Sequence, residues 1–89
     1  MRGRRRQEGI TLALVRNFVH ISKDGSRIHG EVECGYLSFT SSGRTYLQLD
    51  TYGSKGREIP GKVSQSIQLD ADGARELLAL IKHTFPGLT

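Results

Sequence analysis

The chain has 89 residues, one cysteine, 36% hydrophobic residues and a formal net charge of +4. This length allows one small domain, the single cysteine excludes an internal disulfide framework, and no apolar run approaches the roughly 20 residues that span a bilayer. The charge excess comes entirely from four N-terminal arginines, since the rest of the chain is formally neutral: Arg2, Arg4, Arg5 and Arg6. We therefore expect a cytoplasmic protein with a disordered basic tail over residues 1–9 and one domain over residues 10–86.

The first strand signal surrounds Asp24-Gly25, which suits a two-residue type I′ turn because both positions accept a positive φ. A hairpin folded at this turn sorts the flanking side chains into an apolar and a polar face, with Val15 opposite Cys34. A helix over residues 11–21 is the alternative, but the β-branched residues and the turn favour strands. The sequence thus predicts a hairpin between Val15 and Cys34.

A second hairpin is predicted around residues 41–43, Ser-Ser-Gly. A three-residue loop with a left-handed glycine places Leu37 opposite Leu47 and keeps apolar side chains on one face. A two-residue loop would oppose Ser38 to Leu47 and mix the faces, so the longer loop is preferred. The apolar positions also change phase near Gly35, which predicts a β-bulge there.

The C-terminal half predicts a loop over residues 53–62, a fourth strand over residues 63–69 and a helix capped by Asp70 or Asp72. The apolar stripe of this helix has the spacing i, i+3, i+4, i+7, i+11: Ala74, Leu77, Leu78, Ile81 and Phe85. The expected fold class is α+β, a curved four-stranded antiparallel sheet followed by one C-terminal helix (β-β-β-β-α).

The predicted open sheet face carries tyrosines interleaved with amide and cationic side chains. Such a surface is typical of single-strand binding, because bases stack on aromatic rings and cations meet phosphates. The candidate nucleic-acid-binding residues on this face are Tyr36, Arg44, Tyr46, Gln48 and Tyr52. Further cations come from the loop and the tail: Lys55, Arg57, Lys62, Arg4, Arg5 and Arg6. Asp50 lies within the face and opposes a polyanion, and an ordinary solvated sheet face is the simpler interpretation.

Other reactive side chains do not assemble a site in this sequence. His20 and His29 face each other in the predicted hairpin, but zinc needs a third and a fourth ligand. Cys34 is expected in the core, without the base that a nucleophile needs. We therefore expect no metal, no cofactor and no catalytic activity.

Several segments resemble a known family in their order along the chain: Tyr36-Leu-Ser-Phe39, Tyr46-Leu-Gln-Leu-Asp-Thr-Tyr52, Pro60-Gly-Lys62 and Ser66-Ile-Gln-Leu69, then the helix. Over about residues 36–82 this order resembles the PC4 family of transcriptional-coactivator-type single-stranded DNA-binding proteins. The resemblance implies four antiparallel strands, a helix, a dimer and curved sheets that bind single-stranded nucleic acid. Asp50 stands where the family usually has an arginine.

Two functional hypotheses follow from these observations. The first is a non-catalytic module that binds single-stranded DNA or RNA and forms a homodimer through the C-terminal helix, with no membrane contact. A thin core favours such a dimer. The alternative is a protein-interaction or regulatory subunit with the same fold and no nucleic-acid binding, which the acidic Asp50 supports.

Overall fold

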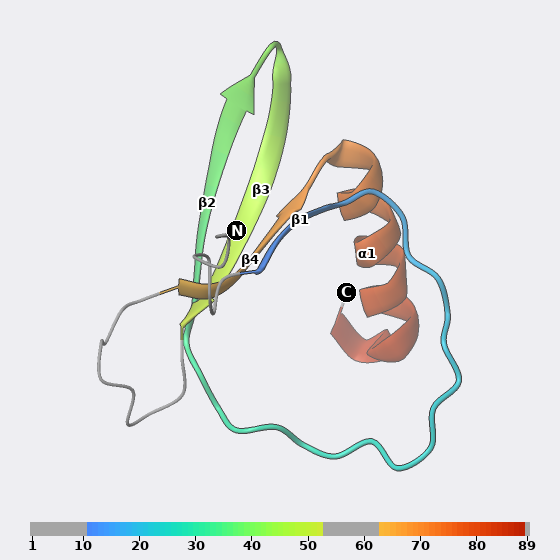
Figure 1. Cartoon of the computed structure of the whole chain (residues 1–89). Coiled ribbons are helices and arrows are strands. Elements are labelled where there is room, and N and C mark those ends of the chain that lie inside the picture. Colours follow the sequence, from blue (N-terminus) through green and yellow to red (C-terminus); the bar gives the residue numbers. More distant parts are fainter. Residues whose placement is uncertain (1–10, 53–62, 89) are drawn as a thin grey trace, which may run out of the picture.

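The computed structural model describes residues 11–52 and 63–88, which form a four-stranded sheet and a C-terminal helix (Figure 1). The strands are β1 (Thr11–Val15), β2 (Cys34–Ser41), β3 (Arg44–Tyr52) and β4 (Val63–Leu69). Helix α1 (Ala71–Thr84) follows β4, and the short 3-10 helix η1 (Pro86–Leu88) ends the described chain. The predicted α+β class with one C-terminal helix is confirmed. Within the described ranges, no helix has the length and apolar content needed to cross a membrane.

The sheet is mixed, because its first strand runs parallel to its last. The strand order is β1-β4-β3-β2, with β1 parallel to β4 and the other two pairings antiparallel. The prediction of a wholly antiparallel sheet is therefore wrong at β1. The pairing is favourable because β4 would otherwise have an unpaired backbone edge. The nearly continuous apolar run of β1 is also typical of a strand in a parallel pair.

The predicted first hairpin does not form, and residues 16–33 instead make an arch without strand or helix that joins β1 to β2 (Figure 1). Gly25 does adopt a positive φ of 71°. However, the two ends of the predicted hairpin belong to opposite edges of the sheet, since Val15 pairs with Leu69 and Cys34 pairs with Thr51. The alternating apolar side chains of the arch therefore have no partner strand to pack against, and Ile28 is fully exposed.

The second hairpin forms, but with the two-residue loop that the sequence argument rejects. Ser42 and Gly43 have φ values of 51° and 78°, as a type I′ turn requires, and Ser38 lies opposite Leu47. This turn is favoured because its twist matches that of the flanking strands. The expected bulge near Gly35 is also absent from the β2–β3 register, and the irregularity falls between Thr51 and Tyr52 in the β3–β4 pairing.

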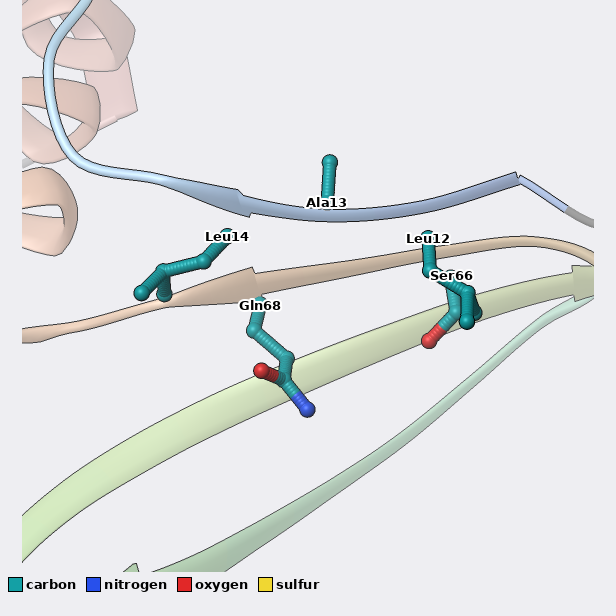
Figure 2. Close-up of a pocket in the computed structure, with 5 residues that line it drawn as sticks. All are labelled: Leu12, Ala13, Leu14, Ser66 and Gln68. Carbon is teal, nitrogen blue, oxygen red and sulfur yellow. The ribbon is translucent and has the colours of Figure 1, made fainter.

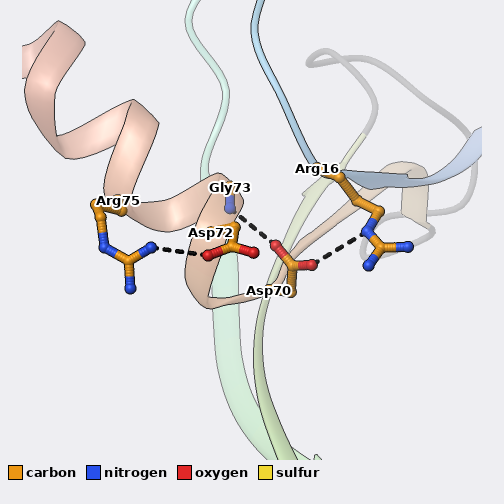
Figure 3. Close-up of polar contacts among 5 residues, drawn as sticks. All are labelled: Arg16, Asp70, Asp72, Gly73 and Arg75. Atoms are coloured by element: carbon orange, nitrogen blue, oxygen red, sulfur yellow. Dashed lines mark hydrogen bonds and ion pairs between the residues drawn. The ribbon is translucent and has the colours of Figure 1, made fainter.

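Asp70 caps helix α1 and ties it to the chain that follows β1 (Figure 3). Its carboxylate accepts a hydrogen bond from the Gly73 backbone N–H at 2.8 Å and another from Arg16 Nε at 3.2 Å. The Gly73 N–H, and then the Arg16 charge, lower the pKa of Asp70, although partial desolvation opposes them. The other candidate cap, Asp72, lies in the first turn and pairs with Arg75 at 2.7 Å.

The first turns of α1 are fixed closely against the end of β1. Gly73 is buried, and a Cβ atom at this position would overlap the carbonyl oxygen of Val15. One turn further on, Glu76 Oε1 accepts a hydrogen bond from the backbone N–H of Phe18 at 2.9 Å. The helix therefore depends on a glycine where its backbone meets the backbone of β1.

The apolar core is small. Among the described residues, Leu69 is the one apolar side chain that is fully buried, with 3% of its surface exposed. Of the predicted helix stripe, Leu77 and Ile81 are half-buried, whereas Leu78 and Phe85 are exposed. The apolar surface of α1 thus exceeds what the sheet of the same chain covers.

Candidate nucleic-acid interface

Alternation along β3 gives the sheet two chemically different faces. One face, which we call the tyrosine face, carries alternate residues of β3: Arg44, Tyr46, Gln48, Asp50 and Tyr52. The other, which we call the leucine face, carries the β3 leucines and their partners on β4: Leu47, Leu49, Ile67 and Leu69. Leu69 on the leucine face is buried and so is Ser66 on the tyrosine face, and each face also carries exposed side chains.

Four of the five predicted sheet residues share the tyrosine face, and one does not. Arg44, Tyr46, Gln48 and Tyr52 lie on the same strand at alternate positions. Tyr36 instead lies opposite Leu49 on the leucine face, where 79% of its surface is exposed. A shift of one residue in strand register moves every side chain of that strand to the other face, so the wrong loop length misplaced Tyr36.

The same shift brings Phe39 to the tyrosine face, where the sequence argument did not place it. Phe39 lies directly opposite Tyr46, and the two rings stack with centroids 5.4 Å apart and planes 21° apart. Arg44, which is exposed, lies two residues before Tyr46 on the same strand. A Ser-Gly dipeptide accepted as a type I′ turn would have revealed this aromatic pair from the sequence.

The third aromatic residue, Tyr52, lies at the far end of the tyrosine face. A Cβ atom on Gly35 would approach Tyr52 Oη to 2.6 Å, so the phenol occupies the space that a side chain at position 35 would need. Gly35 lies opposite Asp50, which fixes the face on which this contact occurs. A glycine at this position therefore lets the Tyr52 ring lie across β2.

A polar network occupies the centre of the tyrosine face, between the two aromatic groups. Gln68 Nε2 donates to Gln48 Oε1 at 2.9 Å, and Gln48 Nε2 donates to Asp50 Oδ1 at 3.1 Å and Oδ2 at 3.3 Å. Gln68 lies within the predicted fourth strand over residues 63–69, but it was not among the candidate binding residues. Its pairing with Gln48 follows from the β3–β4 register, which could not be read from the sequence.

The predicted cations of the loop and the tail, Lys55, Arg57, Lys62, Arg4, Arg5 and Arg6, lie outside the described residues, and so does the tail over residues 1–9. Of the candidate binding cations, Arg44 is the one that lies within the described residues.

The predictions for Cys34, His20 and His29 are corrected by the fold. Cys34 is exposed at the start of β2 and is not a core residue, because its expected partner Val15 lies in β1. The two histidines do not oppose each other in a hairpin, since both lie in the irregular arch. Over residues 11–52 and 63–88, no cluster of three or more His, Cys, Asp or Glu side chains forms a potential metal site.

Comparison of the chain with protein-family models, with curated proteins and with solved structures found no match. The tyrosine face itself offers three kinds of contact to a ligand. Stacked rings, one guanidinium and an ordered row of carboxamides can stack planar groups, contact an anion and form directed hydrogen bonds.

Proposed function

We propose that the protein is a non-catalytic module that binds single-stranded nucleic acid on its tyrosine face. The stacked pair of Phe39 and Tyr46 beside the exposed Arg44 carries this proposal. Bases stack on aromatic rings whatever their sequence, and a neighbouring cation contacts the phosphate backbone.

The length of the tyrosine face suits a strand of several nucleotides. From Arg44 to Tyr52 the face follows β3 over about 26 Å at the usual rise of a strand. The Phe39–Tyr46 pair stacks bases near the hairpin end, and Tyr52 stacks a base at the other end. The order of β2, β3, β4 and α1 over residues 36–82 agrees with the resemblance to the PC4 family, which supports the same ligand class.

A titration with fluorescently labelled oligonucleotides tests this function. The full chain and a chain without residues 1–6 are titrated with single-stranded DNA, single-stranded RNA and duplex DNA at a low and a high salt concentration. We expect both chains to bind single strands more tightly than duplex, and the shorter chain to bind more weakly because it lacks four arginines. Loss of all binding on removal of residues 1–6, or no binding at low salt, would refute a role for the sheet.

A protein-binding role for the same face is the second candidate, and two observations favour it. Asp50 places a negative charge in the middle of the face, and Leu37, on the same face, is 47% exposed. Replacing Arg44 by alanine distinguishes the two roles. For nucleic acid, the slope of log affinity against log salt should fall by about 0.7, the contribution of one single-strand phosphate. If the face binds protein instead, we expect neither the unaltered chain nor Arg44→Ala to bind the oligonucleotide above background.

We also propose that two copies of the chain associate through helix α1. The core of one chain buries Leu69 alone among the described apolar side chains, whereas Leu78 and Leu80 on α1 are 53% and 45% exposed. Domains of this size that lack staples commonly gain stability from a subunit partner. A second copy would cover the apolar surface of α1 and leave both tyrosine faces open.

A further inference from the structure

The polar network on the tyrosine face fixes the orientation of one carboxamide. An ionised carboxylate only accepts hydrogen bonds, so the amide nitrogen of Gln48 must face Asp50. The Gln48 oxygen then points to Gln68, and only the amide nitrogen of Gln68 can meet it. Asp50 therefore determines, through Gln48, which atom of Gln68 is left over.

The Gln68 carboxamide has a donor and an acceptor that the network does not use. Its nitrogen has given one hydrogen to Gln48, which leaves a second N–H and the Oε1 acceptor side by side. Among the described residues, neither of these groups has a hydrogen-bond partner. A carboxamide held in this way presents an adjacent acceptor and donor without the freedom to flip.

A hollow of about 310 Å³ lies next to this carboxamide, between β1 and β4 (Figure 2). Gln68, Ser66 and two leucines of β1, Leu12 and Leu14, line it together with Ala13, which lies beside Ile67 of the leucine face. In the parallel register Leu12 lies beside Ser66 and Leu14 beside Gln68, so all four side chains share the tyrosine face. Leu12 is 70% exposed and Leu14 is 43% exposed, so both leucines offer apolar surface to a ligand.

We propose that this hollow binds one unpaired base of the strand by its Watson–Crick edge. The inference rests on the proposed function, because it names a subsite for the same ligand. Every base carries an adjacent donor and acceptor on that edge, which complement the acceptor and donor of Gln68, while the leucines contact the ring. In a duplex this edge is already paired, so the subsite selects single strands.

This subsite also gives Asp50 a function on a surface that binds a polyanion. The carboxylate weakens phosphate binding by charge, but it orients Gln48 and thereby Gln68. A side chain at position 50 that is neutral and accepts no hydrogen bond would remove the repulsion and the orientation together. Replacing Asp50 should therefore raise the total affinity for the strand and lower the preference for a free base edge.

The test compares oligothymidylate with the same oligomer built from N3-methylthymidine, whose base still stacks but has a blocked Watson–Crick edge. The full chain should bind the unmodified oligomer about fivefold or more tightly, the ratio expected for one good bidentate contact. In Gln68→Leu this ratio should fall to about one. The matched control is Gln65→Leu, since Gln65 is exposed on the same strand and lies opposite Thr51 on the leucine face, and its ratio should stay unchanged.

A second variant, Asp50→Leu, removes both the charge and the acceptor that orients Gln48. We expect it to bind both oligomers at least as tightly as the unaltered chain and to lose most of the preference for the unmodified one. Equal affinity of the unaltered chain for both oligomers would overturn the subsite and leave the proposed function standing. Absence of binding to either oligomer would overturn both, and displacement of the oligomer from the hollow by an uncharged peptide would assign the Gln68 carboxamide to a peptide amide instead.

Discussion

Replacing Gly73 by alanine should destabilise the protein, although the same change usually stabilises a helix. Gly73 lies in the first turn of α1 and is buried against β1. A Cβ atom at this position would overlap the Val15 carbonyl oxygen and lie 3.3 Å from Asp70 Oδ1. The Val15 atom belongs to the backbone, so it cannot rotate away as the end of a flexible side chain can.

The expected size follows from two opposing effects. Alanine gains about 1 kcal/mol of helix propensity over glycine, whereas overpacking a close contact costs about 1–3 kcal/mol. The displaced backbone also weakens the hydrogen bond from the Gly73 N–H to the capping carboxylate. We therefore expect a net loss of about 1 kcal/mol in the free energy of unfolding, or a fall of roughly 4–8 °C in Tm.

The measurement is urea unfolding followed by far-UV circular dichroism, with all variants at the same protein concentration. Ala79→Gly is the matched control, because Ala79 is exposed on the same helix and reports glycine propensity alone, at a cost of about 1 kcal/mol. A Gly73→Ala variant more stable than the unaltered chain would refute the close contact between α1 and β1.

Three further predictions concern the cap, Tyr52 and the dimer. The lowered pKa of Asp70 means that its carboxylate stabilises the fold above the ordinary aspartate pKa of about 3.9 and ceases to do so as pH falls through the lowered value. Urea unfolding should therefore show Asp70→Asn less stable than the unaltered chain at pH 7, with a difference that shrinks in acid; a constant difference would contradict the assignment. Gly35→Ala should push Tyr52 aside and weaken oligonucleotide binding by roughly fivefold, the loss of one base stack, whereas Gly30→Ala, which meets nothing within 4 Å, should have no effect. Light scattering at micromolar concentration should give twice the 9.9 kDa chain mass, and Leu80→Lys should give the monomer; a monomeric unaltered chain would refute the dimer.

The parts of the fold that the sequence predicted correctly are those fixed by local chemistry. The strand over residues 63–69 and the helix with its Asp70 cap depend on alternation, helical spacing and one capping side chain, all of which lie close together in the chain. The alternation of β3 also predicted which of its own residues share a face.

The errors had two causes, pairing with strands distant in the sequence and the geometry of one tight turn. Residues 16–33 alternate like a hairpin, but β4 takes Val15 and β3 takes Cys34, so local alternation was overridden by tertiary pairing. At Ser42-Gly43 the turn geometry decided the register, and the predicted sorting of apolar side chains did not. This shift of one residue in the register places Phe39, and not Tyr36, on the tyrosine face. The Gln68 subsite could not be found in advance, because its leucines come from β1.

The most direct test of nucleic-acid binding on the tyrosine face is the affinity of two tyrosine variants for one labelled single-stranded oligonucleotide. Tyr46 stacks with Phe39 on the tyrosine face, whereas Tyr36 lies on the leucine face and is 79% exposed. We predict that Tyr46→Ala raises Kd roughly fivefold to 150-fold, the range for losing one base stack, and that Tyr36→Ala leaves Kd unchanged. Equal effects of the two variants, or a larger effect of Tyr36→Ala, in proteins whose circular dichroism matches the unaltered chain, would contradict the account.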